Sequence, residues 1–235
     1  MMMATDEVEV VLVHGAWADG SSWNAVTREL QSRGLHVVAT SIPMTSLQDD
    51  VQSLERALGR VKGPVVLGAH AYSGAVISAV RSDRIRALVF IAALTPDHGE
   101  SVSDVFYREQ PHAKAPQLAP DTYGLIWMPE ESFQSAFAHH ATPEQAALLA
   151  ATQRPIAVAC IQEKVPQPLW KRVRSWYLIA EEDRMIHPKT QRFLGERMGA
   201  LVRSTKADHT PLVTDPLPVV DTFMDAVAEV RKSAK

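Results

Sequence analysis

Short apolar runs alternate with segments of helical periodicity along most of this chain, and this alternation restricts its fold more than any other feature. Six runs have the length of a buried strand: residues 8–14, 36–42, 65–69, 85–93, 175–180 and 200–205. Parallel strands that are covered by helices on both faces read as near-continuous apolar runs. The pattern therefore predicts an α/β fold with a doubly wound, mostly parallel sheet of about six strands.

Helices are predicted between these runs. Apolar residues recur three or four positions apart in several segments, and a capping-box signal, Ser46 with Asp49 three residues later, precedes one of them. The predicted helices occupy about 22–34, about 47–62, 73–79, a segment that begins near 188, and about 217–232. The small side chains of 73–79 predict a helix that packs close to the sheet.

The segment from 95 to about 170 breaks the alternation. Most of the 15 prolines lie within it, among short amphipathic stretches such as 131–139. We interpret it as a small cap of short helices, inserted after the fourth strand of a single domain that spans 1–235. Because ligands bind at the carboxyl ends of the strands in open α/β sheets, the cap is expected to cover the ligand site.

Composition restricts the partners of this chain. The net charge is −3 and the basic residues are scattered, so neither nucleic acid nor a membrane surface is expected as a partner. No apolar run is long enough to span a membrane, and the amino-terminal residues lack the pattern of a secretory signal. We expect a cytoplasmic protein, monomeric or homodimeric, whose partner is a small-molecule substrate. The single cysteine, Cys160, excludes an internal disulfide and is expected to be a buried apolar side chain.

Four motifs lie in or just after strand-like runs. VLVHGAW covers 11–17, VVLGAHAYSGAVI covers 65–77, AEEDRMI covers 180–186 and KADHTPLVTDP covers 206–216. Together they resemble the α/β-hydrolase family, in particular its small-cap branch of hydroxynitrile lyases and related carboxylesterases. The resemblance covers nearly the whole chain, and the order nucleophile, acid, histidine is the order of the family.

The elbow of this family commonly reads V-L-V-G-H-S-x-G-G, and the segment 65–77 departs from it. Alignment of the strand and of the residues after it places Ala69 at the first glycine, Ala71 at the nucleophilic serine and Ser73 at the next glycine. The turn requires small neighbours, and alanine and serine are small. The resemblance thus implies an elbow that keeps its shape, whereas Ala71 offers no nucleophilic atom for an acyl-enzyme.

Two origins of Ala71 are open. A serine-to-alanine knockout of a serine esterase would change one residue, whereas positions 69 and 73 differ here as well, which favours natural divergence. Ser73 is an alternative nucleophile only if the elbow slides by two residues. That slip would lengthen the strand and displace the following helix, so a small packing residue is the simpler interpretation of Ser73.

The resemblance assigns the other two catalytic positions to His209 and Asp183. His209 lies between the last strand and the last helix, and Asp183 follows the fifth strand. Asp183 would orient the imidazole and stabilise its cation. Glu181 and Glu182 are adjacent competitors, but Asp183 matches the register of the family.

Backbone N–H groups are expected to form the oxyanion hole, so side-chain identity matters little there. The resemblance assigns the donors to Ala16, after the His14–Gly15 turn, and to Tyr72, after the elbow residue. His14 and His70 are interpreted as structural histidines, because the corresponding positions of the family serve the fold.

The cap is expected to form an apolar substrate pocket. The candidates for its walls are aromatic: Trp17, Tyr107, Trp127, Phe133, Phe137 and Trp170. His112, His139 and His140 also lie in the cap but lack the spacing of a metal site, so no metal or other cofactor is predicted.

These residues predict an enzyme that acts on a small, largely apolar carbonyl-containing substrate, such as an ester or a lactone. A His209–Asp183 dyad that faces two backbone donors suits general acid–base catalysis without a covalent intermediate. By resemblance, hydroxynitrile lyases and cofactor-free dioxygenases show that the fold does not require acyl transfer. Two alternatives stay open: a serine esterase or lactonase that carries a serine-to-alanine change at 71, and a non-catalytic protein that binds a ligand in the same pocket.

Overall fold

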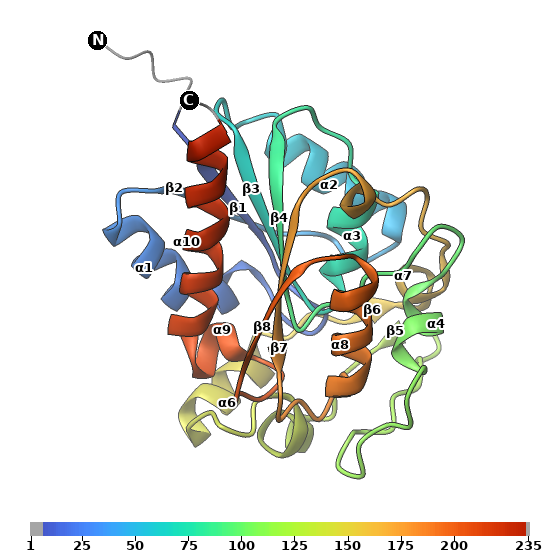
Figure 1. The fold of residues 1–235 in the computed structure, drawn as a ribbon. Coiled ribbons are helices and arrows are strands. Elements are labelled where there is room, and N and C mark those ends of the chain that lie inside the picture. Colours follow the sequence, from blue (N-terminus) through green and yellow to red (C-terminus); the bar gives the residue numbers. More distant parts are fainter. Residues whose placement is uncertain (1–6, 234–235) are drawn as a thin grey trace.

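A six-stranded parallel sheet forms the centre of the molecule (Figure 1). The computed structural model describes residues 7–233. The strands follow the order β2–β1–β3–β4–β7–β8, and every neighbouring pair is parallel. They are β1 (Glu9–Val13), β2 (His36–Thr40), β3 (Val65–His70), β4 (Ile85–Ile91), β7 (Ser175–Ala180) and β8 (Leu201–Thr205). The predicted α/β fold is confirmed, and each strand lies where an apolar run predicts it.

Helices cover both faces of this sheet (Figure 1). One face carries α1 (Asn24–Ser32) and α10 (Pro216–Ser233). The other carries α2 (Leu47–Leu58), α3 (Ser73–Ala79) and α8 (Pro188–Arg197). Because successive side chains of a strand point to opposite faces, β1 contributes to two cores. Val10 and Leu12 pack in the core with α1 and α10, whereas Val11 and Val13 pack in the core with α2, α3 and α8.

Two helix boundaries differ from the prediction. The segment predicted as one helix from residue 22 is a 3-10 turn, η1 (Gly20–Trp23), followed by α1. α2 ends at Leu58 instead of near 62, and Val61 donates its N–H to the carbonyl of Leu58 at 3.4 Å in a turn. Val61 is nevertheless buried in the same core as Leu54 and Leu58 of α2. It continues the helical spacing of apolar residues because it is buried, although it lies beyond the end of the helix.

The segment between β4 and β7 forms the cap over the carboxyl ends of the strands. Its elements are α4 (Val102–Phe106), β5 (Leu125–Ile126), α5 (Glu130–Ser132), η2 (Phe133–Phe137), α6 (Pro143–Ala151), β6 (Ile156–Ala157), α7 (Val158–Gln162) and η3 (Leu169–Lys171). Short helices are present as expected, but the antiparallel pair β5–β6 is not predicted from sequence. Strands of two residues are too short to give an alternating pattern.

The cap has a small apolar core of its own. Phe133 and Phe137 pack there with Met185, which lies in the segment after β7. Trp17, in the segment after β1, packs against the same cluster and donates its indole N–H to the carbonyl of Ile126 at 3.0 Å. Segments that follow two different strands therefore attach the cap to the sheet.

Backbone strain gathers at the carboxyl edge of the sheet. Among residues 7–233, four residues other than glycine have a left-handed φ: Trp17 (57°), Met44 (59°), Ala71 (50°) and Ala92 (42°). They follow β1, β2, β3 and β4 in turn. This conformation costs a residue with a Cβ on the order of 1 kcal/mol, and such residues cluster at functional sites.

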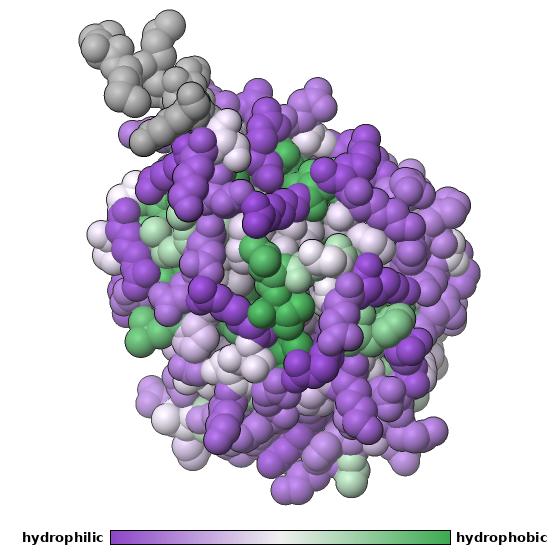
Figure 2. Space-filling model, in the orientation of Figure 1, coloured by the Kyte–Doolittle hydropathy of each residue, from purple (hydrophilic) through white to green (hydrophobic). Residues whose placement is uncertain are grey.

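The face of the molecule in Figure 2 is mostly hydrophilic, with a narrow hydrophobic band across it. The edge strand β8 runs on this side in Figure 1, and its Leu201 and Val202 are exposed. Between residues 7 and 233, no helix is both long enough and apolar enough to cross a membrane.

Candidate active site

Ala71 occupies a tight turn between β3 and α3, with φ in the left-handed region. Its N–H donates to the carbonyl of Ile91 at 3.2 Å, and its own carbonyl accepts from the N–H of Leu94 at 3.0 Å. Neighbouring atoms leave no room for a side chain at two glycines beside this turn: a Cβ on Gly15 would lie 3.0 Å from the Cβ of Ala71, and one on Gly74 would lie 2.4 Å from the carbonyl oxygen of Leu94. Packing therefore requires small residues around this turn, as the sequence pattern indicates.

Ser73 lies in the first turn of α3, and its hydroxyl is directed at the backbone. The Oγ atom accepts the N–H of His70 at 3.1 Å and lies 2.9 Å from the carbonyl of Val13 and 2.8 Å from that of His70. The side chain is fully buried and does not line the cavity beside Ala71. The strained turn is thus at residue 71, and Ser73 joins the ends of β1 and β3.

His209 and Asp183 form a buried hydrogen-bonded pair near the turn at Ala71. Nδ1 of His209 lies 2.8 Å from Oδ2 of Asp183, and the two side chains are 3% and 0% exposed. Asp183 follows β7 and His209 follows β8, so the pairing of these adjacent parallel strands brings the two residues together. A carboxylate only accepts hydrogen bonds, so Nδ1 carries the proton in the neutral ring and Nε2 is left as the basic nitrogen.

The carboxylate of Asp183 is fixed by further donors. Its Oδ1 accepts the backbone N–H groups of Met185 at 2.7 Å and Ile186 at 2.9 Å, and its Oδ2 accepts the side-chain amide of Gln191 at 2.7 Å. These donors stabilise the ionised carboxylate and hold it toward His209. The neighbouring acids point elsewhere: Glu181 pairs with an arginine of α8, and Glu182 with a histidine of the cap.

The backbone around His209 is also anchored. Nε2 of His70 donates to the carbonyl of His209 at 2.7 Å. Burial, with a smaller effect of the neighbouring His209, holds the pKa of His70 well below its usual range, so the ring is neutral. The buried Asp208 accepts the N–H of Thr210 at 2.9 Å and that of His140 in the cap at 2.8 Å. His70 thus supports the position of His209 and does not itself line the cavity.

His14 is a buried structural histidine. Its Nδ1 donates to the carbonyl of Gly15 at 2.9 Å, and its Nε2 accepts the N–H of Ile42 at 3.2 Å. Burial lowers its pKa to about 4. Both ring nitrogens are therefore used within the fold: Nδ1 in the turn after β1, and Nε2 in joining that turn to the segment after β2.

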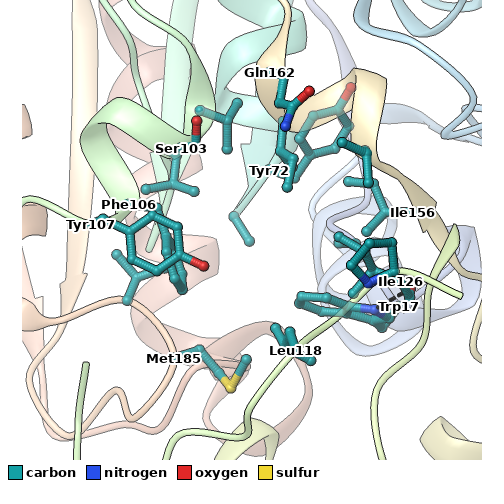
Figure 3. A pocket seen from close by; sticks show the side chains of 18 of the residues that line it. Trp17, Tyr72, Ser103, Phe106, Tyr107, Leu118, Ile126, Ile156, Gln162 and Met185 are labelled. Atoms are coloured by element: carbon teal, nitrogen blue, oxygen red, sulfur yellow. Dashed lines mark hydrogen bonds between the residues drawn. The ribbon is translucent and has the colours of Figure 1, made fainter. Parts of the chain in front are cut away.

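A cavity of about 300 Å³ lies between the carboxyl edge of the sheet and the cap (Figure 3). Ala16, Ala71, Tyr72 and His209 line it from the segments after β1, β3 and β8. None of its lining residues is an aspartate, glutamate, lysine or arginine. An enclosed, uncharged wall of this kind suits a neutral and largely apolar ligand.

Two of the predicted wall residues, Trp17 and Tyr107, line this cavity (Figure 3). The rest of the wall is mainly apolar and is not predicted from sequence: Leu94, Val102, Phe106, Leu118, Pro120, Ile126, Ile156, Val158, Ile161, Met185 and Ile186, with the polar Ser103 and Gln162. Leu118 and Pro120 lie in a loop, and the other cap residues among them lie in elements of two to five residues, whose patterns are too short to show which face is inward.

The other predicted wall residues lie outside the cavity lining, which corrects the prediction. Phe137 is buried behind the wall, with its ring 5.2 Å from that of His209, and packs on Phe133. Trp127 is 47% exposed. Trp170 is buried in the main core beside α3. A size-based selection of aromatic residues cannot tell a pocket wall from the core that supports it.

Two backbone N–H groups beside the cavity have no partner. Among the hydrogen bonds of the described residues, neither the N–H of Ala16 nor that of Tyr72 donates to a protein acceptor. Both residues are buried and line the cavity. Buried N–H groups are nearly always paired, so two unpaired donors beside one cavity are unusual.

One group of side chains at the edge of the cap has the composition of a metal site. His139, His140 and Glu182 each offer a ligand atom, and these atoms lie within 4.8 Å of one another. The sequence shows no such pattern because Glu182 is far from the histidines along the chain. His140 Nε2 lies 2.9 Å from a Glu182 oxygen, so a hydrogen bond accounts for this contact.

Comparisons with known proteins agree with this architecture. The sequence model of the alpha/beta hydrolase family matches residues 10–222. A carbendazim hydrolyzing esterase of Nocardioides sp. (strain SG-4G) is 30% identical over 129 residues, which cover 48% of this chain and 52% of that protein. The chain spans about half the length of the curated relatives it matches.

Solved structures match over nearly the full length. A pyrethroid hydrolase from Sphingobium faniae JZ-2 has a TM-score of 0.82 at 20% identity, with 94% of this chain and 98% of that chain covered. Tomato methylketone synthase I has a TM-score of 0.78 at 16% identity, with 96% and 99% covered. The fold, the turn after β3 and the match of the family over most of the sequence lead to one conclusion: this chain is a member of the alpha/beta hydrolase family.

Proposed function

We propose that this chain is an enzyme that acts on a small, neutral, largely apolar carbonyl compound, such as an ester or a lactone, by acid–base catalysis without a covalent intermediate. The observation that carries the proposal is the arrangement at the cavity. A buried His209–Asp183 pair lies beside a strained turn whose residue, Ala71, ends in a methyl group. An intact acid–base pair without a hydroxyl at the turn favours direct activation of water or of the substrate.

The proposed reaction begins with a water molecule that donates its proton to Nε2 of His209 while its oxygen adds to the carbonyl carbon. Asp183 stabilises the imidazolium that forms. The negative charge that develops on the carbonyl oxygen is received by the N–H groups of Ala16 and Tyr72. Collapse of the tetrahedral intermediate breaks the bond to the leaving alkoxide, which takes the proton back from His209. A lyase reaction would use the same residues to move a proton of the substrate instead.

The nature of the cavity supports an apolar carbonyl substrate. No aspartate, glutamate, lysine or arginine lines its walls. Relatives of this chain are named as esterases, and the structure of tomato methylketone synthase I is a complex with 2-tridecanone, an apolar ketone. A ligand of this type would place one oxygen at the two unpaired N–H groups and its hydrocarbon part against the cap.

The test compares this chain with Ala71→Ser, His209→Ala and the double variant on a panel of small esters, lactones and cyanohydrins. The proposal expects turnover of one class by the unchanged chain, loss of about 10³-fold or more with His209→Ala, and no labelling of the unchanged chain by a fluorophosphonate. The double variant controls for labelling at residue 71 that does not depend on the histidine.

Two outcomes would overturn the proposal. Fast ester turnover that appears only with Ala71→Ser, together with His209-dependent labelling, would identify a serine esterase or lactonase whose nucleophile has been replaced. Ligand binding that persists in His209→Ala, without turnover by any of the proteins, would identify a binding protein.

A further inference from the structure

A buried carboxylate from α2 lies behind the wall of the cavity. Asp50 is fully buried, and its Oδ2 lies 2.6 Å from the hydroxyl of Tyr72. Its Oδ1 accepts the N–H of Met44 at 2.6 Å, and the thiol of Cys160 lies 3.7 Å from Oδ2. Three donors from three separate segments therefore meet on one carboxylate.

The segments of Tyr72 and Cys160 border the cavity, and the segment of Met44 joins the cap, because the carbonyl of Met44 accepts the N–H of Ala157 at 3.0 Å. Met44 is in the loop after β2 and has a left-handed φ of 59°. Tyr72 follows Ala71 at the strained turn, and its ring forms part of the cavity wall (Figure 3). Cys160 is in α7 of the cap, whose neighbours Val158 and Ile161 line the cavity.

No cation compensates the charge of Asp50 within the described part of the chain, where its side chain has only these hydrogen-bond donors. The titratable groups that face it are Tyr72, Cys160 and, on its own helix, Asp49. Burial raises the pKa of Asp50 to about 6 and that of Cys160 to about 12. A buried acid without a cationic partner lowers stability, so an apolar residue would serve the core better.

We propose that Asp50 is a positioning residue. It holds the ring of Tyr72, and through it the backbone N–H of Tyr72 at the turn, and it holds α7 of the cap against the core. The first part of this inference rests on the function proposed above, because it concerns the oxyanion donor at Tyr72; the second part, the attachment of the cap, does not.

An amide cannot replace this carboxylate in the same geometry. The N–H of Met44 and the hydroxyl of Tyr72 both donate to Asp50, on different oxygens. Asparagine has one acceptor oxygen and an NH₂ group that only donates. Asp50→Asn therefore leaves one donor facing another, or reverses the hydrogen bond to Tyr72, while the size of the side chain is unchanged.

The test uses Asp50→Asn and Tyr72→Phe, with Glu55→Gln as the matched control. Glu55 is an exposed residue of the same helix, and its substitution makes the same chemical change. One readout is kcat and KM on the substrate that the panel of esters, lactones and cyanohydrins identifies. The other is the rate at which a nitrobenzoate disulfide reagent labels Cys160, the single cysteine of the chain, in the folded protein.

We expect Asp50→Asn to lower kcat about tenfold or more with KM changed less than about threefold, since the group it positions acts on the transition state. The reagent should also label Cys160 about tenfold faster in Asp50→Asn than in the unchanged chain, because α7 of the cap separates from the core more often. Tyr72→Phe should also lower kcat and speed the labelling of Cys160, each by less than Asp50→Asn does. Glu55→Gln should leave kcat and the labelling rate unchanged.

The two readouts separate the two proposals. Faster labelling with an unchanged kcat would mean that Asp50 only holds the cap, and would overturn its positioning role at the turn. An unchanged labelling rate in Asp50→Asn would overturn the attachment of α7, whatever happens to kcat. If no substrate is turned over by the unchanged chain, the proposed function fails, and the labelling rate still decides whether Asp50 attaches the cap.

Discussion

Residue 71 differs from serine by a single oxygen atom, and the proposed mechanism depends on the absence of that atom. With a methyl group at the turn, the basic nitrogen of His209 has no protein hydroxyl to activate there. A serine side chain is only slightly larger than alanine, so Ala71→Ser tests the chemistry of the site with little change in its packing.

Gly15 shows how closely the residues of the site approach one another. A Cβ at this position would lie 2.8 Å from Nδ1 of His70 and 3.0 Å from the Cβ of Ala71. Gly15→Ala should therefore lower the free energy of unfolding by about 1–3 kcal/mol and reduce activity by displacing Ala16. Urea denaturation and kcat/KM measure the two effects. Gly20→Ala is the control, because its Cβ would meet nothing closer than 3.5 Å, and an equal loss in both variants would contradict the explanation.

Asp50 gives the protein a distinctive pH dependence. Burial raises the pKa of Asp50 from its ordinary value of 3.8 to about 6 in the folded protein, so between these values the folded state keeps a proton that the unfolded state releases. Its contribution to stability is therefore present below pH 4 and is lost as pH rises to about 6, by up to about 3 kcal/mol. Urea denaturation from pH 4 to 7.5 should show the unchanged chain losing stability relative to Asp50→Asn. Parallel curves for the two proteins would contradict the assignment.

At the scale of elements, the sequence predicts the strands and helices that are long enough to show a periodic pattern, and it does not predict the shortest elements. The four inner strands are predicted because burial on both faces makes each a continuous apolar run. The edge strands β2 and β8 are more exposed, and they are predicted from shorter apolar runs between helical segments. The pair β5–β6 and the π-type turn η2 are too short to produce a period. The same difference applies to the site. The His209–Asp183 pair and the turn at Ala71 follow regular strands, whereas most of the aliphatic wall comes from the cap. The role of Asp50 is not visible in the sequence, because it depends on the contact of α2 with Tyr72 in the folded protein.

The amino-terminal cap of α2 matters because this helix carries Asp50. Ser46 accepts the N–H of Asp49 at 2.9 Å, which is one of the two hydrogen bonds of the predicted capping box, whereas the carboxylate of Asp49 accepts the hydroxyl of Thr45. Ser46→Ala should lower the free energy of unfolding by about 1 kcal/mol, because that N–H loses its acceptor. Ser46→Asp supplies another acceptor and should restore most of the loss. Thermal denaturation of the three proteins checks this, and equal midpoints would show that the cap contributes nothing.

At the scale of the whole molecule, two cores share one sheet, and α10 covers most of one face. Phe223 of α10 is fully buried and packs edge to face on Trp23, with ring centroids 6.0 Å apart. It also lies directly over Gly68 of β3, where a Cβ would come within 2.2 Å of the phenylalanine ring. The last helix is therefore fitted to the strand that leads into the turn at Ala71.

Phe223→Ala should destabilise the entire domain by about 3–5 kcal/mol, because it opens a cavity at the centre of this core. Leu217→Ala, on an exposed position of the same helix, should change stability by less than about 0.5 kcal/mol. Denaturant unfolding followed by tryptophan fluorescence and by circular dichroism measures both. A loss of helix signal in Phe223→Ala that precedes the fluorescence change would show that α10 detaches alone.

The four left-handed residues that follow β1 to β4 have a consequence for the thermal inactivation of this protein. Glycine would relax the backbone at Trp17 and Met44, but it would also remove two side chains that pack in the core beneath the cap, of which Trp17 also lines the cavity. The strain is therefore held in place by packing, and any loosening of that packing releases it first at the carboxyl edge. On gradual heating, the segments that follow β1 to β4 should change conformation while the sheet is still folded. Loss of activity should therefore occur at a lower temperature than unfolding of the domain.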